Sequence, residues 1–187
     1  LLTVFREGRI IGVGPNTVGN LDARHGLDTS FLFYDGLDKS RRPLGAGRIA
    51  LMTQSGGKLA MYYDAVQEAG LRISHGVAFG NGYATRPHQM LMYNDTRDLT
   101  AEVYYLESDP GRAFIDALKN RTQRRGVVIV KGGRHSANSA IRSHTDSISG
   151  SNSTFIRAAE EAGAIVVTEE QALPLIISMI DSGMAVR

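Results

Sequence analysis

Apolar, β-branched runs alternate regularly with amphipathic stretches along this chain, and few folds accommodate such an alternation. The run Val127–Val130 reads VVIV, which is typical of a strand that is buried on both faces. In contrast, Leu59, Tyr62 and Val66 recur at the spacing of one helix face. The pattern predicts an α/β domain with an open, mainly parallel sheet and helices on both faces.

The same pattern places the individual elements. Strands are expected at 9–13, 49–53, 73–79, 101–106, 127–131 and 164–168. Helices are expected at 57–69, 87–93, 111–120, 152–162 and 169–181. Between Asn20 and Gly47 the composition shifts to Asp, Gly, Arg and Pro, which predicts a linker that leads into a new domain.

Composition excludes several classes of protein. The chain has 187 residues, of which 42% are apolar, enough for a sizeable core. Its formal net charge of +2 does not indicate a nucleic-acid partner. The absence of cysteine excludes disulfides, thiolate metal sites and cysteine nucleophiles. No run is apolar and long enough to predict a membrane anchor or a secretion signal, so a cytoplasmic location is expected.

In an open parallel sheet, ligands bind at the carboxyl ends of the strands, so the loops that follow them are examined first. The loop TQSGGK follows the strand that ends at Thr53. Ser55, Gly56 and Gly57 at a helix start leave backbone N–H groups free for an anion, and Lys58 could add a charge. By itself this loop favours a simple N-cap with a tight turn. It has neither the spacing of a phosphate-loop NTPase nor that of a nucleophile elbow.

Two further loops carry titratable residues. Glu107 follows the apolar strand in YYLES, where a glutamate is either a helix-entry charge or the carboxylate that orients a histidine ring. His144 lies in IRSHTDSISG, within a polar connection longer than is usual between a strand and a helix. Histidine is the usual acid, base or nucleophile at physiological pH, yet the local sequence alone favours a surface residue.

Considered together, these loops resemble a known family, the nucleoside-diphosphate-forming acyl-CoA synthetases, which are relatives of the succinyl-CoA synthetase alpha subunit. The resemblance covers nearly the whole chain, and the ordered set of motifs is far more specific than any one of them. The motifs are GPNTVG (14–19), IALMTQSGG (49–57), VAFGNG (77–82), YYLES (104–108), VIVKGGR (128–134) and SHTDSISGS (143–151).

The resemblance implies a flavodoxin-like domain at 48–187, preceded by a linker at 20–47 and by the tail of a CoA-binding domain at 1–19. Leu1 in place of an initiator methionine is consistent with a piece of a longer chain. In this family a carboxylic acid, CoA and a nucleoside triphosphate give acyl-CoA, nucleoside diphosphate and phosphate. The reaction passes through an acyl phosphate and a phosphorylated histidine.

Residue by residue, His144 occupies the position of the phosphorylated histidine, and Glu107 that of the glutamate that hydrogen-bonds its ring. Ser55, Gly56 and Gly57 match the helix start that cradles the phosphate. The acyl site is implied by a second set of matches, namely Asn16, Thr17, Gly80 and Asn81. One departure stands beside the histidine, because Asp146 replaces the glycine that is usual in the family.

The resemblance further implies coenzyme A, ATP/ADP or GTP/GDP, and Mg²⁺, bound mainly by domains outside this chain. The implied partners are the CoA-binding domain and an ATP-grasp domain or beta subunit, in an oligomer that activates a small carboxylic acid. A protein-bound metal is not expected, since the histidines lack metal-ligand spacing. Of these, His75 is expected in the core or at its edge and His88 is expected to be exposed.

Two rival interpretations belong to other functional classes. The domain could be a non-catalytic regulatory or assembly module, of which Asp146 would be a trace. It could also be a hydrolase that uses Ser55 and His144, an interpretation weakened by the missing nucleophile elbow.

Overall fold

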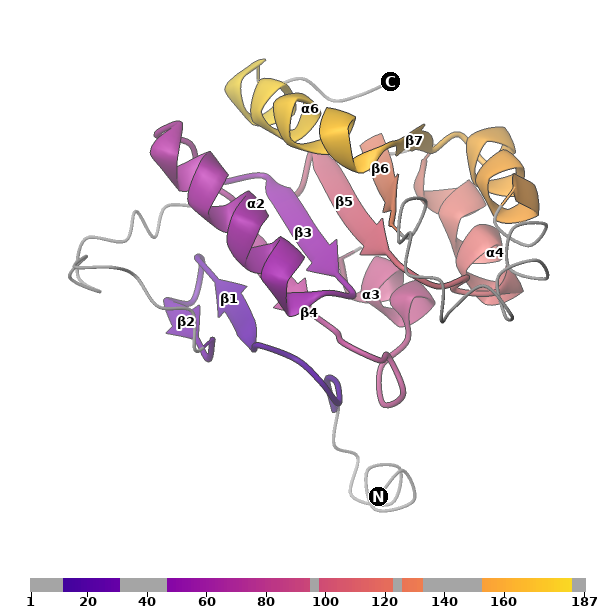
Figure 1. Ribbon diagram of the computed structural model, residues 1–187, viewed down its shortest axis with the longest axis horizontal. Coiled ribbons are helices and arrows are strands. Elements are labelled where there is room, and N and C mark those ends of the chain that lie inside the picture. Colours follow the sequence, from indigo (N-terminus) through magenta and orange to yellow (C-terminus); the bar gives the residue numbers. More distant parts are fainter. Residues whose placement is uncertain (1–11, 31–46, 95–97, 123–125, 133–152, 183–187) are drawn as a thin grey trace, which may run out of the picture.

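One twisted sheet organises the molecule, which is described here from a computed structural model (Figure 1). The structure describes residues 12–30, 47–94, 98–122, 126–132 and 153–182. Seven strands follow the order β2-β1-β4-β3-β5-β6-β7. Their bounds are β1 Asn20–Asp22, β2 Leu27–Asp28, β3 Ile49–Thr53, β4 His75–Ala78, β5 Ala101–Leu106, β6 Gly126–Lys131 and β7 Ile165–Val167. All neighbours from β4 to β7 pair in parallel, as the alternating pattern predicts.

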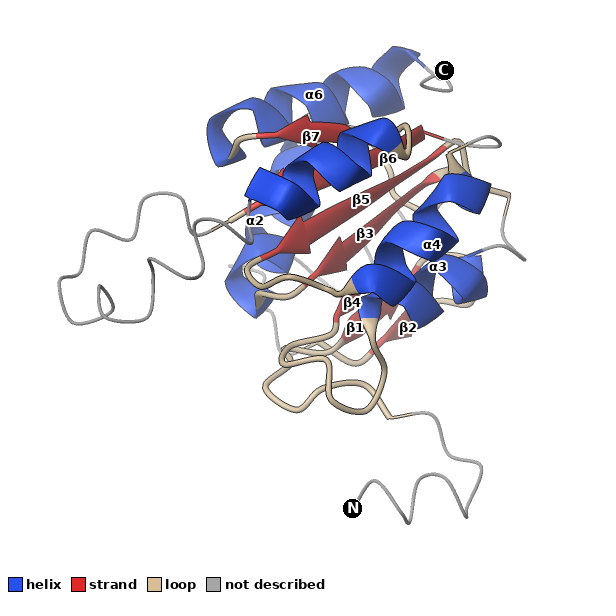
Figure 2. Ribbon diagram, turned by 90° about the vertical axis from the view of Figure 1, so that its right-hand side faces the viewer, coloured by secondary structure: helices blue, strands red, loops and turns tan. Residues whose placement is uncertain are grey.

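Helices cover both faces of the sheet (Figure 2). On one face lie α2 (Gly56–Glu68) and α6 (Glu169–Ser182), and on the other lie α3 (Pro87–Asn94), α4 (Arg112–Arg121) and a helix at 153–161. Each face has its own hydrophobic core, because alternate residues of the central strands point to opposite sides. The predicted α/β, flavodoxin-like open sheet is therefore confirmed.

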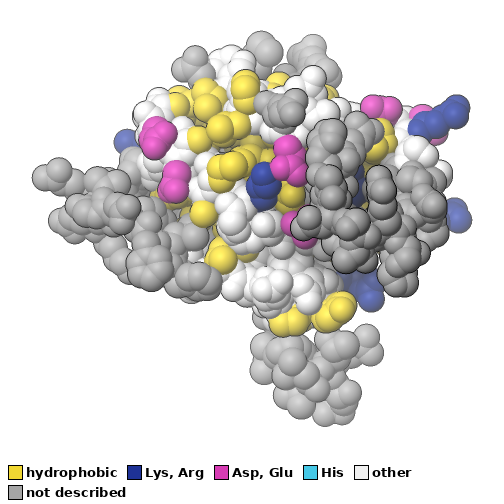
Figure 3. Space-filling view, in the orientation of Figure 1, with side chains coloured by type: hydrophobic (Ala, Val, Ile, Leu, Met, Phe, Trp, Pro, Cys, Tyr) yellow, Lys and Arg dark blue, Asp and Glu magenta, His cyan; other side chains and the backbone are white. Residues whose placement is uncertain are grey.

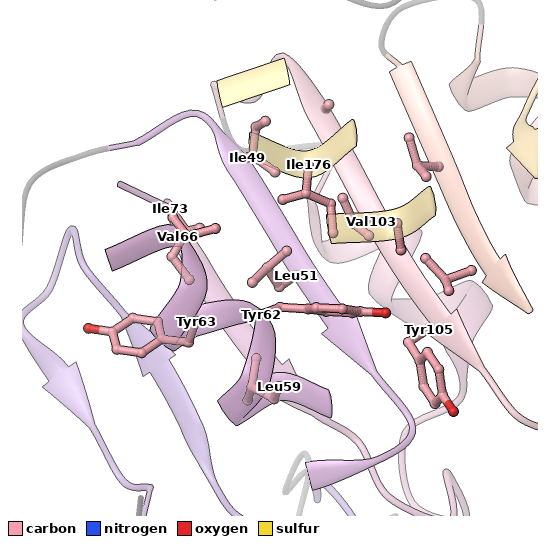
Figure 4. Close-up of a cluster of buried hydrophobic side chains, with 14 of the residues drawn as sticks. Ile49, Leu51, Leu59, Tyr62, Tyr63, Val66, Ile73, Val103, Tyr105 and Ile176 are labelled. Carbon is pink, nitrogen blue, oxygen red and sulfur yellow. The ribbon is translucent and has the colours of Figure 1, made fainter. Parts of the chain in front are cut away.

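The central strands are buried on both faces, as their apolar sequences predict. Every residue of β3, β5 and β6 is buried. Leu51 and Val103 point toward α2 and α6, whereas Met52 and Tyr104 contribute to the core under α3 and α4. Figure 4 shows the first of these cores, in which residues of α2 and α6 meet the same side of the sheet.

The prediction of a linker at 20–47 is wrong for its first residues, which belong to the sheet. Within 20–47, residues 20–22 and 27–28 form a short hairpin, and β1 pairs antiparallel with β4 at the sheet edge. Asp22 accepts backbone hydrogen bonds from Arg24 and His25, so the polar residues that suggested a linker form the hairpin turn. Buried Leu21 anchors the hairpin in the core.

The strand expected at 9–13 falls mostly outside the described residues, and its described part, Gly12 and Val13, has no strand structure. Among the histidines, His75 is buried, with its Nε2 2.9 Å from Oδ1 of Asn94, as predicted. His88 was expected to be exposed, but it is half-buried and its Nδ1 is fully covered, because it lies in the first turn of α3.

A buried hydroxyl gives a prediction about stability. The Tyr62 side chain lies within the core beneath α2, and its hydroxyl has no hydrogen-bond partner among the described residues (Figure 4). Burial, reinforced by Glu169, raises the pKa of Tyr62 from 10.0 to about 12. The folded state therefore binds the Tyr62 hydroxyl proton more tightly than the unfolded state does. Below pH 10.0 the contribution of this hydroxyl to folding stability is fully present, and it is lost as the pH rises toward about 12.

We therefore expect Tyr62→Phe to leave the free energy of unfolding unchanged at neutral pH, or to raise it by up to about 1 kcal/mol, and to flatten its decline at alkaline pH. Urea unfolding across the pH range checks this. Tyr63→Phe is the matched control, because the Tyr63 hydroxyl accepts a 2.5 Å hydrogen bond from Gln67, and its loss should cost about 1 kcal/mol. A larger loss in Tyr62→Phe than in Tyr63→Phe would contradict the prediction.

Candidate functional site

The carboxyl ends of the central strands bring the predicted site residues to one edge of the sheet (Figure 1). Thr53, the last residue of β3, lies in register with Ala78 at the end of β4 and with Tyr105 near the end of β5. The loops that leave these positions carry Ser55–Gly57, Gly80 and Asn81, and Glu107 respectively. The predicted candidates thus converge on one edge wherever the structure describes them.

The start of α2 is an open set of backbone donors. Ser55 occupies the N-cap position, but its side chain makes no capping hydrogen bond, and the first turn contains no acidic residue. The N–H of Leu59 is the first to bond back, to the carbonyl of Ser55, and no described residue accepts from the N–H groups of Gly56 and Gly57. Among the residues that the structure describes, none therefore satisfies the partial positive charge of this helix end.

The two glycines of this helix start differ in role. A Cβ at Gly56 would collide with the side chain of Val18, so this glycine is required by packing against the loop before β1. A Cβ at Gly57 would meet only the Ser55 hydroxyl, at 3.9 Å, and otherwise open space. Of these two glycines, only Gly57 therefore leaves room at its Cα that packing among the described residues does not use.

Gln54 joins the helix start to the loop after β5, a role that sequence reasoning missed. Its side-chain oxygen accepts hydrogen bonds from the backbone N–H groups of Glu107 and Ser108, at 2.9 and 3.1 Å. Its Nε2 donates to the Ser108 hydroxyl at 3.0 Å. This bridge fixes the backbone of Glu107 relative to Ser55. The only signal in the sequence was the amide residue next to the proposed helix start.

Lys131 holds the same loop from the other side and was also missed. This last residue of β6 is buried, and its Nζ donates to the backbone carbonyl of Glu107 at 2.6 Å. The Glu107 carboxylate itself is exposed, with no side-chain partner recorded among the described residues. The backbone of Glu107 is thus held in place, and its carboxylate is available to a hydrogen-bond donor outside the described residues.

The residues expected at the acyl site lie together. Asn16 donates to the Asn81 side chain at 3.4 Å, and the Thr17 hydroxyl donates to the carbonyl of Ala78. Gly80 has a φ of 56°, and a Cβ there would collide with backbone oxygens of the 14–17 loop. The structure thus brings Asn16, Thr17, Gly80 and Asn81 into one contact between two loops.

Lys58 does not turn toward the helix start. Its Nζ lies 2.5 Å from a carboxylate oxygen of Glu169 at the start of α6 and 5.6 Å from the centre of the Tyr105 ring. The Tyr105 hydroxyl donates to the other Glu169 oxygen at 3.1 Å. Burial, followed by Glu169 and Glu107, raises the pKa of Tyr105 above its ordinary value. Basic and acidic side chains accordingly lie side by side on the face that carries α2 and α6 (Figure 3).

His144 and Asp146 lie outside the described residues, as does His135. Within the described ranges, no three His, Asp or Glu side chains come together as metal ligands, and no helix is long and apolar enough to cross a membrane. The expectation that the chain binds no metal by itself stays a prediction.

Comparison with known proteins was made for the whole chain. The ADP-forming acetate–CoA ligase I of Archaeoglobus fulgidus is 29% identical over 164 residues, which cover 86% of this chain and 23% of the relative. The alpha subunit of ADP-forming acetate–CoA ligase II from Pyrococcus furiosus is 28% identical over 158 residues, covering 82% of this chain and 32% of the subunit. The chain therefore spans a quarter to a third of these curated relatives.

A solved structure agrees with both. The dinucleotide-forming acetyl-coenzyme A synthetase 1 of Ca. Korarchaeum cryptofilum, in complex with phosphate and ADP, superimposes with a TM-score of 0.74 at 25% identity. The match covers 92% of this chain and 37% of that one. The family resemblance predicted from the motifs is confirmed. Because the model of the succinyl-CoA ligase like flavodoxin domain matches residues 46–179, which is most of the chain, the protein belongs to that domain family.

Proposed function

We propose that this chain is the phosphohistidine-carrying part of an NDP-forming acyl-CoA synthetase, an acid–thiol ligase. The observation that carries the proposal is the start of α2, where unsatisfied N–H groups and the open space at Gly57 lie next to the Glu107 loop. Membership of the flavodoxin-domain family supports it. The domain division, with a CoA-binding tail at 1–19 and the phosphohistidine domain from 48 onward, is part of the same proposal.

The start of α2 binds the phosphoryl group in this proposal. Backbone N–H groups of Gly56 and Gly57 point at the anion, and the helix dipole favours its negative charge. The Ser55 hydroxyl, free of a capping bond, is a further donor. Since the first turn contains no carboxylate, the phosphate does not have to displace a competing anion.

Glu107 orients the nucleophile. His144 attacks with one ring nitrogen, and the carboxylate accepts a hydrogen bond from the other, which fixes the tautomer and stabilises the charge that develops on the ring. The bridge from Gln54 and the hydrogen bond from Lys131 support this role, because they fix the backbone on which the carboxylate is carried. Asn16, Thr17, Gly80 and Asn81 line the acyl site.

Further components complete the reaction. Coenzyme A supplies the thiol that takes the acyl group, and ATP or GTP with Mg²⁺ supplies the phosphoryl group. We assign these mainly to a CoA-binding domain and an ATP-grasp domain or beta subunit in an oligomer. Two pockets among the described residues have volumes of about 150 and 180 Å³, which is too small for a nucleotide. The relative from Pyrococcus furiosus is named as an alpha subunit, which supports a partner chain.

The hydrolase alternative gains no support. Its base, His144, lies outside the described residues, and the loop TQSGGK lacks the spacing of a nucleophile elbow. A regulatory or assembly module remains the functional rival, and it differs from the enzyme in one measurable property, which is covalent phosphate on His144.

The test uses this chain together with its CoA-binding and nucleotide-binding parts. Incubation with γ-labelled ATP should give protein-bound label that is acid-labile and base-stable, and peptide mapping should place it on His144. Label should be lost on addition of ADP, as expected of a reversible carrier. An unlabelled protein that still supports assembly with its partners would favour the regulatory module.

A further inference from the structure

One carboxylate, that of Glu169, joins the first turns of α2 and α6 at the sheet edge where the proposed site lies. Both helices follow the carboxyl ends of parallel strands, β3 and β7, and cover the same face of the sheet (Figure 1). One Glu169 oxygen lies 2.5 Å from Nζ of Lys58 in the first turn of α2. The other accepts a hydrogen bond from the Tyr105 hydroxyl at 3.1 Å. A single side chain of α6 therefore contacts both α2 and β5.

The stability of α2 does not explain why Lys58 occupies its first turn. A cation there opposes the partial positive charge of the helix end, whereas a carboxylate on Glu169, the first residue of α6, is favoured. The pair is partly buried, with side chains that are 25% and 39% exposed. The Lys58 ammonium also lies 5.6 Å from the centre of the Tyr105 ring. Partners on two other elements therefore hold the Lys58 side chain.

Tyr105 extends this network to two further loops of the proposed site. A Cβ at Gly132 would collide with the Tyr105 hydroxyl, so the first residue after β6 packs directly against it. The Tyr105 carbonyl accepts the N–H of Gln54 at 3.0 Å, and the Gln54 side chain in turn holds the N–H of Glu107. The loops after β3, β5 and β6 thus meet at one tyrosine, whose hydroxyl is bonded to Glu169.

We propose that Glu169 is a positioning residue of the phosphoryl site, which acts through Lys58 and Tyr105 to hold the start of α2 and the loops after β5 and β6 in one arrangement. The inference rests on the proposed function, because this arrangement serves phosphoryl transfer to His144. The carboxylate charge is required, since a neutral amide at this position cannot form the ion pair with Lys58, although its oxygen still accepts the Tyr105 hydroxyl.

Single-turnover labelling of His144 with γ-labelled ATP, in the complete enzyme, tests this role. Glu169→Gln should lower the first-order rate constant about tenfold or more. The ATP concentration that gives half of the maximal rate should not change, because the nucleotide is assigned to another domain. The rate constant, unlike the amount of label, does not depend on the fraction of the protein that is folded. A residue that merely stabilises the fold would therefore change only the amount of label.

A double-mutant cycle shows whether Glu169 acts through Lys58. Lys58→Met should slow labelling about as much as Glu169→Gln, and the double variant should be no slower than either, since all three lack the same ion pair. Lys58→Arg keeps a cation and should label at nearly the wild-type rate. The matched control is Glu161→Gln, which removes the carboxylate of an exposed ion pair with Arg157 on the other face of the sheet and should not slow labelling.

Amide hydrogen exchange measures the positioning directly. The N–H groups of Gln54 and Gly132 donate to backbone carbonyls of β5, at 3.0 and 2.9 Å. Both should exchange about tenfold faster in Glu169→Gln than in the wild type, because the loops that carry them are held less firmly. Glu161→Gln should leave both exchange rates unchanged.

The outcomes separate this inference from the proposed function. A wild-type labelling rate in Glu169→Gln, or unchanged exchange at both amides, would overturn the assignment of Glu169 while the relay through His144 stands. Additive losses in the double variant would overturn the action through Lys58. A wild-type enzyme that takes up no label on His144 would refute the proposed function and the role of Glu169 together.

Discussion

Complete loss of acid-labile phosphate is the expected result of replacing His144 by asparagine. Asparagine keeps a polar side chain of similar length but has no nucleophilic nitrogen, so the covalent carrier cannot form. Acyl-CoA synthesis by the complete enzyme should fall with it, by about 10³-fold or more, since the relay has no alternative acceptor. Both effects are measured with the labelled nucleotide and with an acyl-CoA assay under identical conditions.

Glu107→Gln should give a smaller loss than His144→Asn. A residue that acts by orienting the nucleophile typically contributes about 10- to 100-fold, and glutamine keeps the size of the side chain while removing the charge. The rate of labelling should therefore fall, while the label that forms still maps to His144.

The matched control for His144→Asn is His25→Asn, because His25 is an exposed residue of the β1–β2 turn, near the amino end of β4. It should be labelled like the wild type. Labelling of His144→Asn at the wild-type level would refute the relay.

Local pattern was sufficient to predict the parallel part of the sheet and its helices. β3 and β5 lie at the predicted residues, since a mainly apolar run of this length is buried in a parallel sheet, and Glu102 is the one charged residue within these two strands. The β1–β2 hairpin was missed because its two strands have three and two residues, and their stability comes from pairing with β4 rather than from their own sequence.

The positions of the candidate site residues could be predicted from the sequence, but the hydrogen bonds that hold the site loops in place could not. Loops after parallel strands meet at one edge, so Ser55 and Glu107 could be placed there from the sequence. Gln54 and Lys131 act through contacts between loops that are far apart in the chain, and no local signal reports such contacts. Gly56 also has a packing cause that the sequence did not indicate, because a Cβ at this position would collide with the side chain of Val18.

The buried pair of Arg121 and Glu102 carries the largest expected effect on stability. Their side chains are 4% and 0% exposed, and Nη2 of Arg121 lies 2.5 Å from Oε1 of Glu102. The second carboxylate oxygen accepts hydrogen bonds from Asn94 at 2.7 Å and from the Tyr104 hydroxyl at 2.9 Å. The network joins α3, α4 and β5 beneath the sheet, away from the proposed phosphoryl site.

Arg121→Met should lower the free energy of unfolding by about 3–5 kcal/mol, because it removes the cation and leaves the Glu102 carboxylate buried without its partner. Chemical denaturation at neutral pH measures the change. The double variant Glu102→Gln/Arg121→Met should recover most of this loss, since glutamine carries no charge and its oxygen still accepts from Asn94 and Tyr104.

An exposed pair on the same side of the sheet separates the effect of burial from that of losing an arginine. Arg157 and Glu161 have side chains that are 83% and 67% exposed, so Arg157→Met should cost less than about 1 kcal/mol. If Arg121→Met lowered the free energy of unfolding by no more than Arg157→Met does, burial of the Glu102 carboxylate would not require the Arg121 cation. If the double variant were as unstable as the single one, the loss would come from packing of the Arg121 side chain rather than from an uncompensated charge.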